Sequence, residues 1–355
     1  MITHVRIMKD DTSLSPENDW KEYFLNQDYK VVVDLLKRRS ETHKLTFDEV
    51  KAYITSLALI GKIYDAINLI DNVHKQYNNR IEFNNLKAYL HLLDEDYRQA
   101  NSLYQVSIEH DTENIEAYIF LAFVNVMCNN HIHAENYIGY ANCLLDTSSD
   151  KKNKLIASCI EGLIGLEKKD TKRFKKYLSQ VDTLVEETYA PLEFLMPYFM
   201  NKRRYNEGLQ FANKIIEKFP KNPFFCCMIG FLQIKFKNYE SAVAYFEKAS
   251  ASGFESFNFL LSWSYSLSKI KKHEEAYNKV MRALELGYSP YVFSLLGWIN
   301  YCKGNFEEAE KAYKRGIEIY PDDAALSAKL CRLYLRKYRF KDAIKEFIRG
   351  IKAET

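Results

Sequence analysis

The side chains in this sequence best suited to catalysis or metal binding are one pair of histidines and one pair of cysteines. His131 and His133 are two residues apart, which places them on different faces of a helix, and no further ligand follows at the spacing of a metal site. Cys226 and Cys227 are neighbours on a predicted helix, where adjacent side chains point apart, so ordinary packing is favoured over redox chemistry. Walker A, dinucleotide-binding and nucleophile-elbow motifs do not occur. We therefore expect no catalytic residue, no metal, no cofactor and no enzymatic activity.

A basic stripe near the C-terminal end is a second chemical feature. Lys329, Arg332 and Arg336 recur at i, i+3 and i+7 of a predicted helix, so they share one face. Nucleic-acid binding would use such a stripe for phosphate contacts. We favour a solvated helix face, with an acidic protein partner as the second interpretation and nucleic acid after it.

The composition predicts that helices position these side chains. The 355 residues include only 12 Gly and 7 Pro, whereas 26 Tyr and 22 Phe supply bulky groups for packing between helices. So few turn-forming residues exclude collagenous, disordered and multi-stranded β architectures. No stretch approaches the roughly 18 consecutive apolar residues of a membrane span, and the first residues lack the apolar core of a signal peptide. Seven cysteines without CxxC spacing favour the reducing cytoplasm.

A 34-residue period runs through the sequence. Small residues that open the second helix of each unit define the register: Ala66, Ala100, Ala134, Ala242, Ala276, Ala309 and Ala343. Three residues earlier, bulky residues recur: Tyr29, Ile63, Tyr97, Tyr205, Tyr239, Phe306 and Phe340. Four residues later, a third set recurs: Leu36, Ile70, Tyr104, Ile138, Leu178, Ala212, Phe246, Val280, Tyr313 and Phe347. Three positions that repeat together indicate a repeated helix–turn–helix unit.

The clearest unit is PYVFSLLGWINYCKGNFEEAEKAYKRGIEIYPDD at Pro290–Asp323. Its Gly297, Gly304, Ala309 and Pro321 are spaced in a way that resembles the tetratricopeptide repeat (TPR). The resemblance covers most of the chain and implies an all-α solenoid, a right-handed superhelix of about ten antiparallel helix pairs. The predicted motif starts are residues 13, 47, 81, 115, 155, 189, 223, 257, 290 and 324.

The register divides the chain into a tail at 1–12, four acidic repeats at 13–148, a polar insertion at 149–154 and six basic repeats at 155–355. Residues 1–150 carry 14 Lys and Arg against 23 Asp and Glu, and residues 151–355 carry 36 against 24. The insertion is either a hinge between two halves or a lengthened helix or loop in one solenoid. Pro197 lies inside a predicted helix and is expected to kink or shorten it.

The resemblance implies that the first helix of each pair, helix A, lines a concave surface and that its positions 2, 5, 9 and 12 contact a partner. The two-carboxylate clamp of some TPR co-chaperones is excluded, because Lys51 at position 5 is followed by Thr55 at position 9 and Leu86 at the next position 6. Apolar and aromatic residues occupy these positions instead. The predicted partner-binding groove consists of Ile119, Phe123, Phe224, Phe231, Leu261, Tyr265, Tyr291, Trp298 and Tyr301. They are either exposed for a partner or buried by tight curvature.

Ile344, Ile348 and Ile351 lie at i, i+4 and i+7 of the last predicted helix and form a predicted association end, which another copy or a partner would cover. We predict a cytoplasmic adaptor or scaffold, and more narrowly a secretion or assembly chaperone. It would hold an extended peptide or helix of another protein in the groove. The alternative is a regulatory TPR protein whose two halves close on a peptide ligand.

Overall fold

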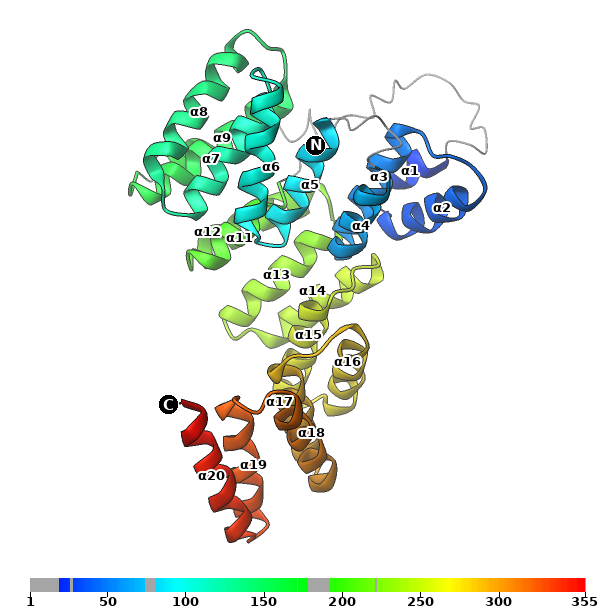
Figure 1. The fold of residues 1–355 in the computed structure, drawn as a ribbon, viewed down its shortest axis with the longest axis vertical. Helices are drawn as coiled ribbons and strands as arrows, with labels where there is room; N and C mark the ends of the chain where they lie inside the picture. Colours follow the sequence, from blue (N-terminus) through cyan, green and yellow to red (C-terminus); the bar gives the residue numbers. More distant parts are fainter. Residues whose placement is uncertain are drawn as a thin grey trace. The chain divides into compact units, whose positions relative to one another are not determined.

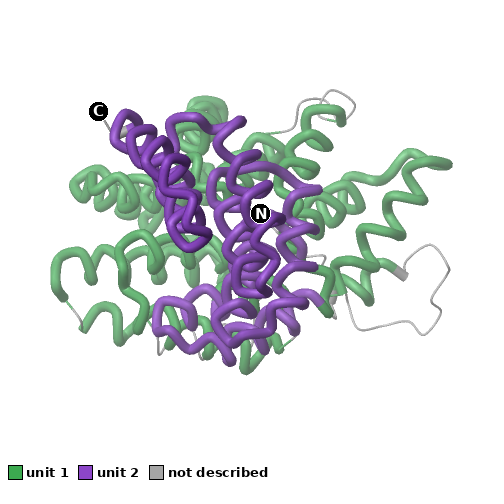
Figure 2. The backbone as a smooth tube through the Cα atoms, turned by 90° about the horizontal axis from the view of Figure 1, so that it is seen from below, with its two compact units in different colours: residues 1–228, 251–254 green, residues 229–250, 255–355 purple. Residues whose placement is uncertain are grey.

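The computed structural model describes residues 19–25, 28–73, 81–170, 172–177, 192–220 and 222–354. These residues form helices joined by short connections, and no strand occurs among them. The chain divides into two compact units (Figure 2). Unit 1 comprises residues 1–228 and 251–254, and unit 2 comprises residues 229–250 and 255–355.

The helices follow one another in pairs along the sequence (Figure 1). Those of unit 1 are α1 (Asp19–Leu25), α2 (Tyr29–Thr42), α3 (Phe47–Leu59), α4 (Ile63–Val73), α5 (Ile81–Leu93), α6 (Tyr97–His110), α7 (Ile115–Met127), α8 (His131–Asp146), α9 (Lys151–Glu167), α11 (Leu195–Asn201) and α12 (Tyr205–Lys218). Both units contain residues of α13 (Pro223–Lys235) and α14 (Tyr239–Ala251). Unit 2 continues with α15 (Phe257–Lys269), α16 (His273–Leu286), α17 (Pro290–Cys302), α18 (Phe306–Ile319), α19 (Ala324–Arg336) and α20 (Phe340–Glu354).

Polar residues just before the first turn determine where several helices begin. The side chains of Asn114, Ser256, Ser289 and Asp323 each accept a hydrogen bond, at 2.8–3.3 Å, from the backbone N–H three residues further on. These N-caps satisfy donors that the first helical turn leaves unpaired. α7, α15, α17 and α19 therefore begin at the predicted residues, as do α3, α5 and α13.

The 34-residue register corresponds to the packing within each helix pair. The small residues that define the register are buried throughout. In unit 2, Phe246 packs over Gly230 and Tyr313 over Gly297, so closely that a Cβ atom on either glycine would overlap the aromatic ring. Glycine at these positions lets the two helices of a pair approach each other, with the ring filling the space beside it.

The turn between the two helices of a pair has a repeated backbone conformation. Five positions before the small residue, the backbone enters the left-handed region, with φ of 86° at Gly61 and 81° at Gly304. In the other turns whose residues the structure describes at this position, a residue with a side chain takes this conformation, at φ of 56–65°: Glu95, Asn129, Lys169, Arg203, Lys237, Lys271 and Tyr338. This conformation costs a residue with a side chain roughly 1–2 kcal/mol but costs glycine almost nothing. The turns without glycine are therefore strained.

The polar insertion contributes the first turn of a longer helix. The Asp150 side chain accepts a hydrogen bond from the backbone N–H of Asn153 at 3.0 Å, so α9 begins at Lys151 and not near residue 155 as predicted. A hinge at 149–154 stays a prediction. The boundaries between the two compact units lie at other residues, near 228–229 and 250–255.

The helix that contains Pro197 is short, as predicted: α11 has only seven residues. Its predicted start at 189 lies outside the described residues, as do the tail at 1–12 and the first motif start at 13. Among the helices of the described ranges, none has the length and apolar character needed to cross a membrane.

Candidate functional site

Four of the residues predicted to line a groove are buried. Ile119 and Phe123 of α7 have no exposed surface, and Phe224 of α13 and Leu261 of α15 expose only 5% and 4%. The sequence left their exposure open, and the structure decides it: they pack within the chain and offer no surface to a partner.

A residue of unit 1 itself fills the inner face of α7. The ring centroid of Phe194, just before α11, lies 5.0 Å from that of Phe120 and 4.7 Å from that of Phe123, both edge to face. It also lies 6.4 Å from the ring of Tyr89 in α5. The Tyr89 hydroxyl donates to Glu193 at 3.5 Å. The chain around Phe194 therefore covers the inner face of α7, where Ile119 and Phe123 are predicted groove residues.

The other predicted groove residues have exposed surface. Phe231 at the start of unit 2 is half-buried, as are Tyr265 and Tyr301, whereas Tyr291 and Trp298 expose 46% and 43% of their surface. The aromatic residues of α17 lie at i, i+7 and i+10 and share one face of the helix.

Four cationic residues accompany these aromatic side chains on three consecutive helices A of unit 2. We call the combined set the aromatic–basic face: Tyr265 and Lys269 on α15, Tyr291, Trp298 and Tyr301 on α17, and Lys329, Arg332 and Arg336 on α19.

Trp298 stands on a rigid support. Its ring stacks on Tyr301, with centroids 5.7 Å apart and an interplanar angle of 16°. The Arg336 guanidinium lies 5.2 Å from the Tyr301 centroid and donates to the Tyr301 hydroxyl at 2.8 Å. Phe306 of α18 contacts Tyr301 edge to face at 5.5 Å. Because residues of α18 and α19 both hold Tyr301, the exposed indole is already oriented before any partner arrives.

Tyr265 and Tyr291 present phenol groups from neighbouring helices A. The Tyr265 ring contacts Tyr239 edge to face at 5.8 Å, and the Lys269 ammonium lies 5.1 Å from its centroid. Desolvation raises the pKa of Tyr291 to about 12, with a further contribution from Tyr265. Tyr291 therefore keeps its proton at neutral pH and can donate a hydrogen bond.

The cations of the face remain available for acidic groups. Lys329 donates to the Ser294 hydroxyl, and its partial burial lowers its pKa. Lys269, Arg332 and Arg336 form no ion pair with any residue that the structure describes. The face is therefore positively charged and bears exposed aromatic surface, a combination that suits carboxylates next to an apolar group.

In the sequence, the aromatic residues and the basic stripe are separate features. The structure joins them, because α19 lies beside α17 and places Lys329 on Ser294 and Arg336 on Tyr301. Both pairs are 35 residues apart, one more than the repeat period. That spacing is the signal by which the contact could have been found.

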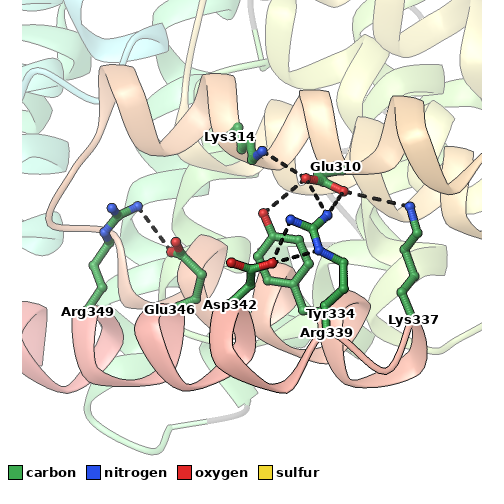
Figure 3. Close-up of polar contacts among 8 residues, drawn as sticks. All are labelled: Glu310, Lys314, Tyr334, Lys337, Arg339, Asp342, Glu346 and Arg349. Carbon is green, nitrogen blue, oxygen red and sulfur yellow. Dashed lines mark hydrogen bonds and ion pairs between the residues drawn. The ribbon is translucent and has the colours of Figure 1, made fainter.

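A polar network centred on Glu310 of α18 attaches α19 and α20 to the preceding pair (Figure 3). The carboxylate accepts hydrogen bonds from Tyr334 at 3.1 Å and from Arg339 at 2.9 and 3.1 Å, and lies 2.8 Å from the Lys314 ammonium. Arg339 also pairs with Asp342 at 2.6 Å. Burial alone would raise the pKa of Glu310, but the hydrogen bonds from Lys314, Arg339 and Tyr334 outweigh it, and the pKa is lowered. The network helps to hold α19, and with it Arg336, beside α17.

Two stretches of the sequence match the tetratricopeptide repeat family, residues 225–251 and residues 290–323. The second is the helix pair α17 and α18, with the glycine–tyrosine contact described above. The chain therefore contains tetratricopeptide repeats at these two places. Its all-α fold of repeated helix pairs is the predicted one.

Several solved structures are similar to this chain. MamA is 17% identical over 47% of this chain and 96% of its own, with a TM-score of 0.42. YrrB, described as a TPR protein with an unusual peptide-binding site, is 20% identical over 47% and 87%, with a TM-score of 0.43. The APC/C hetero-tetramer Cut9–Hcn1 is 15% identical over 96% and 79%, with a TM-score of 0.39. Comparison with curated proteins gives no match.

The last repeat exposes the residues of the predicted association end. Ile344, Ile348 and Ile351 are exposed on α20, together with Phe340 and Phe347. Their spacing places all five on one face, which we call the terminal stripe. Their exposure leaves the association itself a prediction.

Among the described residues, neither the histidine pair nor the cysteine pair belongs to a group that could hold a metal ion. His131 begins α8 and His133 is exposed two residues later. Cys226 and Cys227 are buried in α13, and desolvation raises the pKa of the Cys227 thiol, which stays protonated. In the described part of the chain, no group of three or more His, Cys, Asp or Glu could hold a metal ion.

Proposed function

We propose that this TPR protein is an interaction scaffold that binds a peptide segment of another protein on the aromatic–basic face. One observation carries the proposal: Tyr291 and Trp298 are exposed at inner positions of α17, whereas the chain itself fills the inner face of α7. The role is binding, without catalysis.

The chemistry of the face specifies the partner segment. Exposed aromatic residues on a rigid support are typical of interface hot spots, and Trp298 supplies both a flat apolar ring and an N–H donor. Arg332 and Lys269 supply charges with no ion-pair partner among the described residues. A peptide with one apolar or aromatic anchor beside Asp or Glu residues would satisfy both requirements.

A narrower form of the proposal is a secretion or assembly chaperone. In that role, the face would shield an apolar segment of its client, and the aromatic residues would contribute more to affinity than the cations. Ionic strength separates the two forms, because binding through charges weakens when salt is raised from about 50 to about 500 mM and apolar binding does not.

Peptide selection against the immobilised protein tests the proposal. We expect the selected peptides to combine acidic residues with an apolar anchor. Trp298 is exposed whereas Trp20 and Trp263 are buried, so a shift in intrinsic fluorescence on binding reports on this face.

Matched variants locate the binding surface. With a labelled selected peptide, Trp298→Ala should weaken binding by about tenfold or more. Tyr140→Ala, which removes an exposed aromatic ring from α8, should change it by less than about twofold. Equal losses in the two variants, or selected peptides without acidic residues, would contradict the proposal.

A further inference from the structure

Equivalent positions of three neighbouring helices give the aromatic–basic face a fixed order of side chains. The ninth residue of the helix is Tyr265 in α15, Trp298 in α17 and Arg332 in α19. The last residue of the same three helices is Lys269, Cys302 and Arg336. α17 packs against both α15 and α19. The face therefore has an apolar centre on α17 and a cationic group on the helix at either side of it.

Contacts of α17 show that these cations lie close to it. On the α19 side, the Arg336 guanidinium donates to the Tyr301 hydroxyl at 2.8 Å. On the α15 side, desolvation raises the pKa of the Cys302 thiol and the charge of the Lys269 ammonium opposes that rise. The half-buried Cys302 stays protonated and uncharged. The positive charges thus stand on both sides of the exposed Trp298 ring, with no charge between them.

The separation of these helices limits the conformation of a peptide that crosses them. Packed helices lie about 8–10 Å apart. In a polyproline II (PPII) helix, side chains three residues apart point the same way and are about 9 Å apart. A β-strand places side chains of one face about 7 or about 13 Å apart, which does not match. An α-helix matches only for side chains seven residues apart, at about 10 Å.

The hydrogen-bond donors of α17 favour a PPII segment over an α-helix. The exposed Trp298 and Tyr291 supply an indole N–H and a phenol O–H. A PPII segment leaves its backbone carbonyls unpaired, so these can accept hydrogen bonds, whereas an α-helix pairs its carbonyls internally. Aromatic-lined surfaces are typical of PPII recognition for this reason.

We propose that the partner segment binds as a PPII helix, with an apolar anchor on Trp298 and an acidic residue three positions before and three positions after that anchor. One carboxylate lies at Lys269 and the other at Arg332 and Arg336. This inference rests on the proposed function, because it specifies the peptide that the aromatic–basic face binds.

Two nine-residue peptides of identical composition test the spacing. Each has a central Leu, two Glu, four Pro and a Gly at both ends. Glu stands three residues from Leu on both sides in the first peptide and two residues from Leu in the second. Because proline holds both in PPII, they differ only in where the carboxylates point. Fluorescence anisotropy with the full chain at about 50 mM salt should show at least about tenfold tighter binding of the first peptide. Equal affinities, or tighter binding of the second, would overturn the proposal.

Two further peptides test the conformation. Replacing the four prolines of the first peptide by Ala should weaken binding by about tenfold, because a freer chain loses more entropy when it is ordered. An Ala-rich peptide of about 17 residues, with Glu seven residues from Leu on both sides, represents a helical partner. It should bind more weakly than the first peptide. Tighter binding of either Ala-containing peptide would overturn the proposal.

Charge variants test where the two carboxylates lie. Lys269→Gln and Arg332→Gln should each weaken the first peptide by about three- to tenfold, and each should lose its effect when a different Glu of the peptide is replaced by Gln. Lys248→Gln is the matched control: Lys248 of α14 is exposed and its ammonium lies 5.0 Å from the Tyr245 centroid, as that of Lys269 lies 5.1 Å from Tyr265. It should change the affinity by less than about twofold. Equal effects of Lys248→Gln and Lys269→Gln would overturn the proposal.

Trp298→Ala separates failure of this inference from failure of the proposed function. If both nine-residue peptides bind equally and both weaken by about tenfold in Trp298→Ala, the face binds peptides without the PPII spacing. The inference then fails and the proposed function stands. If none of the peptides binds and peptide selection also yields no ligand, both fail.

Discussion

α7 and α17 are equivalent helices with different surroundings. Both are the first helix of a repeat, and both carry apolar or aromatic residues at the inner positions. In unit 1 the ring of Phe194 packs on Phe123 and closes that surface, whereas in unit 2 Tyr291 and Trp298 remain exposed. The residue types at these positions therefore do not determine whether a repeat binds a partner. What decides is whether another segment of the same chain packs over them.

The largest effect is expected from removing the residue that closes unit 1. Phe194→Ala should lower the stability of unit 1 by about 3–5 kcal/mol, because it leaves a cavity between α5 and α7. Hydrogen exchange of the α5 and α7 amides would measure the loss locally, which matters because the two units need not unfold together. Phe194→Leu, which keeps most of the apolar volume, should cost clearly less. A loss below about 1 kcal/mol for Phe194→Ala would show that this ring is not what holds the inner face closed.

The next largest effect is expected from the network that supports the aromatic–basic face in unit 2. Glu310→Gln removes the charge that Arg339 and Lys314 neutralise and should destabilise α19 and α20 by about 1–3 kcal/mol. Glu308→Gln on the same helix is the control, because Glu308 is exposed and, among the residues that the structure describes, pairs only with Lys311, one turn away. It should change stability by less than about 0.5 kcal/mol. Similar exchange rates in α19 and α20 of both variants would contradict the role of Glu310.

The same carboxylate predicts how the last repeat responds to pH. The pKa of Glu310 is lower in the folded chain than in the unfolded chain. Its contribution is therefore fully present above the unfolded pKa and is lost as pH falls through the folded pKa. The protection factors of the α19 and α20 amides, which correct for the slower intrinsic exchange at low pH, should fall on acidification in the native protein, and Glu310→Gln should reduce that fall.

The sequence predicted the repeats better than the site because different interactions determine them. Helix starts depend on local groups such as Ser289 and Asp323, and pair packing on residues within one repeat, so a 34-residue register captures both. The register predicted the start of α9 at residue 155, whereas Asp150, a typical N-cap residue, caps the helix so that it begins at Lys151. The burial of Phe123 depends on Phe194, which lies two motifs further along the chain. No local pattern reveals such a contact.

Removing the exposed aromatic residue of unit 2 should have a small effect on stability. Trp298→Ala should cost at most about 1 kcal/mol, mainly the stacking on Tyr301. Trp263→Ala, which removes a buried ring from α15, should cost about 3–5 kcal/mol. Thermal unfolding of the two variants compares the stability that an exposed tryptophan contributes with the stability that a buried one contributes. A loss for Trp298→Ala as large as that for Trp263→Ala would remove the distinction between open and closed faces.

The smallest effect should be the same in both units, because it depends on the backbone and not on the inner face. Lys169 in unit 1 and Lys271 in unit 2 hold φ of 63° and 65° in equivalent turns. Glycine relieves roughly 1–2 kcal/mol of strain there but adds freedom to the unfolded chain, so Lys169→Gly and Lys271→Gly should each stabilise by about 0.5 kcal/mol. Gly304→Lys should destabilise by a similar amount. Denaturation midpoints that rise in one unit only would mean that the turns, like the inner faces, differ between the two units.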